Sequence, residues 1–222
     1  MIYLPALKRE RSVNSLGIET PIRAVIWDMG GVLVRTDDMT ARKRLAQSYG
    51  MTLQEVNALV FDSPESIKAT LGELPESAVW ESVAKRFNLT QDGLETFMRE
   101  FWGGDGLDAE LYQLVKTLQT RYKTGLLSNA WSDARSVLDR RYRMLDAFDV
   151  LIFSAEVGMM KPDPRIYQLM LDKLGVLAKE SIFIDDFQVN IDAANALGIH
   201  GVHFESSLQA RQAVMQILAE GN

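Results

Sequence analysis

The sequence contains no cysteine among its 222 residues. Disulfide bonds, thiolate metal sites and a cysteine nucleophile are therefore excluded. The sequence also lacks a continuous apolar run approaching the ~20 residues needed to cross a bilayer. Residues 1–7 have neither the basic leader nor the long apolar core of an export signal. These absences favour a cytoplasmic protein.

Positive charge is not in excess either. Twenty-four lysines and arginines stand against thirty acidic residues, which gives a formal net charge of −6. Such a chain has no overall field that attracts nucleic acid or anionic lipid. We therefore expect neither nucleic acid nor a membrane as a partner. The 47% hydrophobic and 24% charged residues are the balance of an ordinary globular protein.

Five short apolar runs, rich in strand-forming residues, are spread along the chain. They are residues 24–27, 124–127, 150–153, 182–184 and 201–204. Continuous apolarity is typical of parallel strands that are buried on both faces. The segments between the later runs have helical spacing, as in the stripe that follows Asp163-Pro164 and ends at Gly175. This alternation predicts an α/β fold, a Rossmann-like open parallel sheet covered by helices on both faces.

One interval departs from this alternation. About ninety residues separate the first two strands, far more than a simple crossover needs, and their patterns predict only helices, at 42–49, 53–61, 76–87 and 91–102. We interpret residues 37–102 as a small helical cap and 103–106 as its flexible return. The catalytic core then comprises residues 22–36 and 103–222, and residues 1–21 form an N-terminal extension.

Polar residues follow four of the predicted strands, where the carboxyl ends of an open parallel sheet place a binding site. They are Asp28-Met29-Gly30-Gly31, Ser128-Asn129, Lys161, and Asp185-Asp186. Each block alone is compatible with a turn, a helix cap or a surface lysine. Together they combine a carboxylate nucleophile, a cation, hydrogen-bond donors and oxygen ligands that suit Mg²⁺.

In this order and spacing the four blocks resemble the motifs of the haloacid dehalogenase (HAD) superfamily. The helical insert lies where that family places its first type of cap. The resemblance implies a Mg²⁺-dependent phosphatase in which Asp28 takes up the phosphoryl group and Lys161 and Ser128 assist. It also implies a metal site of Asp28, the Gly30 carbonyl, and Asp185 or Asp186. Implied substrate-binding groups are Met29, Gly30, Ser128, Asn129 and Lys161.

The sequence departs from the family pattern at one position. Phosphatases of this family normally carry a second aspartate two residues after the nucleophile, as a general acid, and here that residue is Gly30. A general acid typically contributes 10²–10⁴-fold in rate. The departure leaves three readings: a substrate with a good leaving group, a replacement acid such as Asp37 or Asp38, or weak catalysis.

Two other functions remain open at this stage. A hydrolytic dehalogenase would use the same aspartate, and its halide leaves without a proton, but it needs no metal and so no acidic pair. A non-catalytic phosphate-binding or regulatory protein is the alternative from another class. The expected substrate is a small phosphorylated metabolite.

Overall fold

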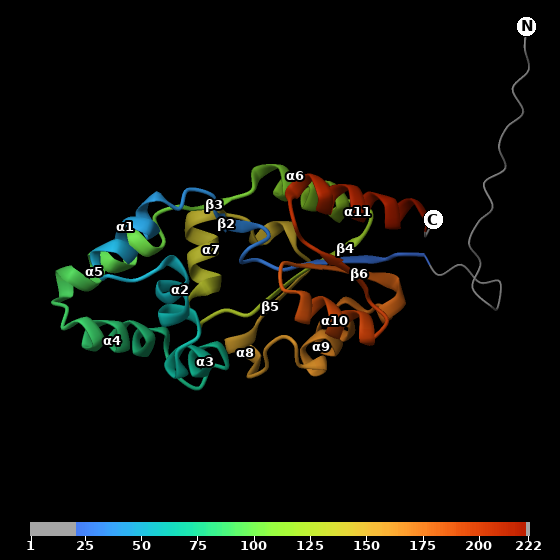
Figure 1. Cartoon of the computed structure of the whole chain (residues 1–222). Coiled ribbons are helices and arrows are strands. Elements are labelled where there is room, and N and C mark those ends of the chain that lie inside the picture. Colours follow the sequence, from blue (N-terminus) through green and yellow to red (C-terminus); the bar gives the residue numbers. More distant parts are fainter. Residues whose placement is uncertain (1–20, 221–222) are drawn as a thin grey trace, which may run out of the picture.

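The computed structural model describes residues 21–220, so the predicted extension lies outside the described residues except for Pro21. A five-stranded sheet forms the centre, with the strand order β5-β4-β1-β6-β7 and parallel pairing throughout (Figure 1). The strands are β1 Ala24–Trp27, β4 Lys123–Ser128, β5 Val150–Phe153, β6 Ser181–Asp185 and β7 His200–His203. The five predicted runs are these five strands, and the predicted fold class is confirmed.

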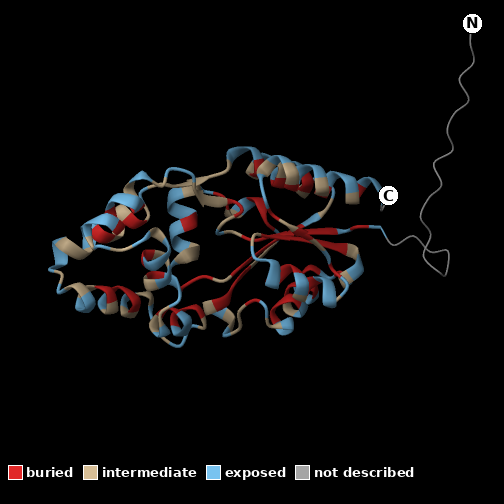
Figure 2. Cartoon of the chain, viewed as in Figure 1, coloured by how far each residue is buried: buried red, intermediate tan, exposed pale blue. Residues whose placement is uncertain are grey.

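Helices cover both faces of the sheet. Each face has its own buried apolar cluster. On the first face lie α6 Ala109–Gln119, α7 Ala134–Tyr142 and α11 Ser207–Glu220. On the second lie α9 Pro164–Leu174 and α10 Gln188–Ala196. Strand β1 supplies both clusters, because Val25 and Trp27 point to the first face while Ala24 and Ile26 point to the second. Burial therefore runs along the strands and the inner sides of the helices (Figure 2).

Five helices form a separate layer between β1 and β4 in the sequence. They are α1 Thr40–Ser48, α2 Leu53–Phe61, α3 Pro64–Thr70, α4 Glu76–Phe87 and α5 Gln91–Phe101. They enclose their own apolar cluster, to which Phe97 and Phe101 contribute fully buried rings. Thr90 caps α5, and its side chain accepts a hydrogen bond from the Gly93 backbone N–H. Helix α3 was not predicted; it has only seven residues, and it begins with a Ser63 cap followed by Pro64.

A two-stranded antiparallel ribbon connects this helical layer to the sheet. It consists of β2 Val34–Thr36 and β3 Asp105–Leu107. Asp105 accepts hydrogen bonds from both the helical layer and the core. Its carboxylate accepts from Thr36 and from Arg42 of α1, and its carbonyl accepts from Arg141 of α7. The flexible return predicted at 103–106 is thus in part a paired strand. A four-residue pattern is too short to reveal this pairing. The strand that pairs with it, β2, also lies about seventy residues earlier in the sequence.

The remaining elements are short. They are α8 Ser154–Val157 and the 3₁₀ helices η1 Leu145–Ala147 and η2 Ala178–Glu180. Among the helices of residues 21–220, none has the length and apolarity that crossing a bilayer requires.

Candidate active site

Asp28 and Lys161 meet at the carboxyl ends of the strands. Asp28 directly follows β1, and its side chain is 7% exposed. The Lys161 Nζ atom lies 2.7 Å from Asp28 Oδ1 and 2.6 Å from Asp185 Oδ2. The side chains of Lys161 and Asp185 are 1% and 0% exposed. Three segments far apart in the sequence therefore converge on one buried ion-pair cluster.

The carboxylate of Asp185 is fully engaged by the protein. Its Oδ1 atom accepts from the Phe187 backbone N–H at 2.8 Å and from Asn190 Nδ2 at 2.9 Å. Its Oδ2 atom accepts from Lys161. The sequence pattern does not show that the amide of Asn190 reaches back to Asp185.

The carboxylate of Asp186 is in the opposite situation. Its Oδ1 atom is buried and has no hydrogen-bond partner within residues 21–220. Gly31, with φ +82°, packs so closely that a Cβ atom there would collide with this carboxylate. One oxygen each from Asp28, Asp185 and Asp186 lies within 4.8 Å of the others. A buried carboxylate oxygen without a partner is costly, and a cation bound by these oxygens would remove that cost.

The charges of this cluster do not balance. Three carboxylates face one ammonium group, and burial raises the pKa of Asp28 to about 7 and that of Asp186 to about 6, with the charge of Asp185 adding to both shifts. For Lys161, burial lowers the pKa, but the charges of Asp28 and Asp185 outweigh it, so the net direction is upward. The side chain therefore stays protonated. The donor set fits a divalent cation with oxygen ligands, such as Mg²⁺.

Uncommitted hydrogen-bond donors lie on the two adjoining loops. Ser128 ends β4 next to β1. Its hydroxyl group, and the backbone N–H groups of Met29 and Asn129, donate no hydrogen bond within the described part of the chain. These are the groups that the sequence suggested for phosphoryl oxygens, and the fold leaves them free.

Neither Asp37 nor Asp38 is placed to replace the general acid that is missing at Gly30. Asp38 accepts a hydrogen bond from the Thr40 backbone at the start of α1, and the Thr40 side chain and this backbone bond lower the pKa of Asp38. Asp37 is exposed and lies 3.4 Å from the guanidinium group of Arg35. Gly30 itself is exposed, and a Cβ atom there would meet nothing within 4 Å. The position is open to a side chain that this sequence does not have.

Trp131 links the site to the helical layer. It lies three residues after Ser128, and its ring centroid is 5.7 Å from that of Trp80 and 6.2 Å from that of Trp102. Phe61, at the end of α2, lies 6.0 Å from it. Trp131 therefore belongs to the apolar cluster of the five helices.

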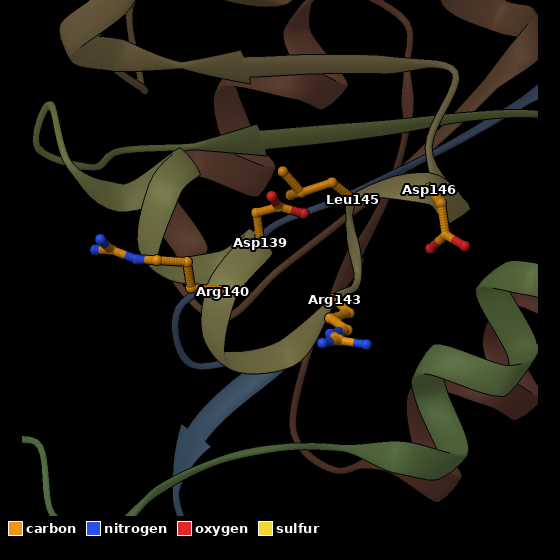
Figure 3. Close-up of a pocket in the computed structure, with 5 residues that line it drawn as sticks. All are labelled: Asp139, Arg140, Arg143, Leu145 and Asp146. Atoms are coloured by element: carbon orange, nitrogen blue, oxygen red, sulfur yellow. The ribbon is translucent and has the colours of Figure 1, made fainter.

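A surface pocket, shown in Figure 3, lies near the amino ends of the strands. It is formed where the end of α7 meets η1, before β5 begins. Its lining residues are Asp139, Arg140, Arg143, Leu145 and Asp146. The acidic cluster lies at the carboxyl ends of the strands, so this pocket is not part of it.

Comparison with known proteins identifies the family. The model of the haloacid dehalogenase-like hydrolases matches residues 22–198, which includes all four blocks of site residues. The chain is a haloacid dehalogenase-like hydrolase. The resemblance read from the sequence is therefore confirmed at the level of the family.

Relatives agree with this assignment, and a solved structure has the same fold. A phosphorylated carbohydrates phosphatase from Thermotoga maritima is 30% identical over 82% of this chain and 84% of its own length. The sesquiterpene phosphatase astK from Aspergillus oryzae is 25% identical over 90% of this chain and 98% of its own. A HAD family enzyme from Bacteroides thetaiotaomicron, solved with magnesium and inorganic phosphate, superposes with a TM-score of 0.70 at 21% identity, over 84% of this chain and 96% of its own.

Proposed function

We propose that this HAD-like hydrolase is a Mg²⁺-dependent phosphatase that hydrolyses a small phosphorylated metabolite through a phosphoaspartate on Asp28. The observation that carries the proposal is the partnerless, buried carboxylate of Asp186 beside the Asp28–Lys161–Asp185 cluster. That arrangement has a nucleophile, a fixed ammonium group and a cation site in one place. Two relatives that are named as phosphatases support the same reaction class.

In the first step, Asp28 attacks phosphorus. Lys161 holds its Oδ1 atom, and the second oxygen, which has no hydrogen bond within residues 21–220, is left to react. The ammonium group of Lys161 and the donors of Ser128, Met29 and Asn129 would bind the phosphoryl oxygens and offset their charge. The P–O bond to the leaving group breaks, and the phosphoryl group stays on Asp28.

In the second step, water attacks the phosphorus of the phosphoaspartate. The P–O bond to Asp28 breaks, inorganic phosphate forms, and the carboxylate of Asp28 is restored. Asp28, Asp186 and the Gly30 carbonyl would hold Mg²⁺, with Asp185 serving chiefly to orient Lys161 because its own oxygens are already bonded. Bound Mg²⁺ supplies positive charge to the nucleophile and the phosphoryl oxygens.

Gly30 narrows the substrate class. No side chain at this position can protonate the departing oxygen, and Asp38 has a lowered pKa that makes it a poor acid near neutral pH. An alkoxide leaves slowly without a proton, whereas an aryl oxide or a carboxylate leaves readily. We therefore propose that the natural substrate is an acyl phosphate or a phosphate ester with an acidic leaving group.

A hydrolytic dehalogenase is the second candidate, since Gly30 would not hinder the departure of a halide. The Asp186 carboxylate argues against it. A metal-free dehalogenase would have to keep this oxygen buried and unpartnered, at a cost of roughly 1–3 kcal/mol. A regulatory phosphate-binding role would use the same groups without turnover.

The test is a panel of phosphate monoesters with graded leaving groups, assayed with Mg²⁺ and with EDTA on the wild type and Asp28→Asn. We expect turnover that needs Mg²⁺, rises steeply with leaving-group acidity and is lost in Asp28→Asn. Turnover of 2-haloacids in EDTA would instead identify a dehalogenase. Tight binding of beryllofluoride with no turnover of any ester would identify a phosphate-binding protein.

A further inference from the structure

Two side chains tie the loop after β4 to the segment after β5. Asn129 donates from Nδ2 to the Lys161 carbonyl at 2.9 Å and accepts from the Lys161 backbone N–H at 2.8 Å. Ser154 does the same for Ala130, accepting from its N–H at 2.9 Å and donating to its carbonyl at 3.1 Å. Each tie consists of two hydrogen bonds between a side chain and one residue's backbone. They differ in the residue that they hold, because only the Asn129 tie ends on Lys161.

We propose that the side chain of Asn129 is a positioning residue, which holds the backbone of Lys161 so that the ammonium group stays between Asp28 and Asp185. This inference rests on the proposed function, because it assigns a role in phosphoryl transfer. It leaves unchanged the expectation that the backbone N–H of Asn129 binds the substrate, and gives the side chain a separate task.

The placement of Lys161 depends on its backbone. The ammonium group lies 2.7 Å from one carboxylate and 2.6 Å from another, and it lies 5.4 Å from the centre of the Phe183 ring. The Lys161 side chain is 1% exposed, so the packing around it leaves its four carbon–carbon bonds little room to compensate for a movement of the main chain. A shift of the Lys161 backbone is therefore passed on to the contact with the nucleophile. A misplacement of about 1 Å in a catalytic group can cost 10²-fold in rate.

Direct binding of phosphate by the Asn129 side chain is disfavoured by the same geometry. Its amide oxygen and its amide nitrogen are each committed to a backbone group of Lys161. The oxygen is in any case an acceptor, and would face the like-charged oxygens of a phosphoryl group. To bind the substrate, the side chain would have to give up the tie.

The experiment compares Asn129→Ala with the matched control Ser154→Ala, using 4-nitrophenyl phosphate and Mg²⁺. Both variants lose a two-bond tie between the same segments, so both should lower the thermal midpoint. We expect Asn129→Ala to lower kcat/KM by about 10–100-fold and Ser154→Ala to lower it by less than about 3-fold. If kcat/KM falls equally in the two variants, in proportion to the fall in their thermal midpoints, the tie is purely structural and the inference is overturned.

A double-mutant cycle with Lys161→Ala separates positioning from substrate contact. If Asn129 acts through Lys161, adding Asn129→Ala to Lys161→Ala changes the dissociation constant for inorganic phosphate with Mg²⁺ by less than about 2-fold, whereas Asn129→Ala alone weakens it about 3–10-fold. Effects that multiply would show that Asn129 binds phosphate itself. Because phosphate binding needs no turnover, the cycle can be read for every variant. A wild type that binds phosphate but turns over no ester would refute the proposed function and leave the positional coupling measurable.

Discussion

The open space at Gly30 allows the missing acid to be restored, which gives a direct test of the leaving-group argument. In Gly30→Asp, the new Cβ meets no atom within 4 Å, and Gly30 is not among the glycines with positive φ. The folded state therefore accepts a Cβ atom at this position without a clash, and the loss of glycine flexibility in the unfolded chain stabilises the protein by about 0.4–1 kcal/mol. The carboxylates of Asp28 and Asp186 nearby would favour a protonated aspartate at position 30.

The expected gain in rate depends on the leaving group. A general acid contributes 10²–10⁴-fold when the departing oxygen needs a proton, which is about 3–5.5 kcal/mol of barrier. Gly30→Asp should therefore raise kcat/KM for an alkyl phosphate by about 10²-fold or more. For 4-nitrophenyl phosphate, whose leaving group needs no proton, the change should stay within about 3-fold.

The assay is steady-state hydrolysis of both esters with Mg²⁺, on the wild type, Gly30→Asp and the control Gly30→Asn. Asparagine has nearly the same size as aspartate but offers no acidic proton. An equal rise for both esters, or the same rise in Gly30→Asn, would refute the reasoning. No rise for the alkyl ester would show that another group already donates the proton.

Three further predictions concern the acidic cluster and its neighbours. Because burial raises the pKa of Asp28 from 3.8 to about 7, the metal-free folded state binds protons more tightly than the unfolded chain. The contribution of Asp28 to the stability of this state should therefore be lost as the pH rises from about 4 to about 7, on the order of 4 kcal/mol. Mg²⁺ should raise the thermal midpoint more at pH 8 than at pH 5, and an equal effect at both would contradict this. Gly31→Ala should abolish the Mg²⁺-induced rise in thermal midpoint, because the added methyl group collides with the Asp186 carboxylate and Gly31 has a left-handed φ; an unaltered Mg²⁺ response would contradict the close contact. Trp131→Ala should lower the free energy of unfolding in urea by about 3 kcal/mol, since Trp131 is 9% exposed and packs against Trp80 and Trp102; a change below about 1 kcal/mol would show that this ring does not join the core to the helical layer.

The sheet could be predicted from the sequence because its signal is local. Each strand is a continuous apolar run, and the acidic or hydroxyl residue that follows it is brought to one edge by the parallel pairing alone. This is why Asp28, Ser128 and the Asp185-Asp186 pair can be grouped from the sequence, whereas Lys161, which lies eight residues after β5, is grouped with them by the family motifs. The helix α3 and the β2–β3 ribbon were missed, since both are too short to carry a clear period.

The division of work within the site could not be predicted in the same way. The sequence does not distinguish the two neighbouring aspartates. In the structure, both oxygens of Asp185 accept hydrogen bonds, from Asn190, Phe187 and Lys161. Asp186 Oδ1 has no partner within residues 21–220. The orientation of Asn129 depends on where the Lys161 backbone lies, thirty-two residues later. Such contacts arise from tertiary packing rather than from spacing.

The central claim is that Asp28 becomes phosphorylated when Mg²⁺ is bound, and it can be tested by trapping that species. Wild-type protein and Asp28→Asn would be mixed briefly with acetyl phosphate and Mg²⁺, quenched in acid, and analysed by peptide mass spectrometry. We expect one added phosphoryl group on the peptide containing Asp28, present in the wild type, absent in Asp28→Asn and absent with EDTA. A phosphoryl group found on another residue, or hydrolysis that persists in Asp28→Asn, would contradict the proposed mechanism.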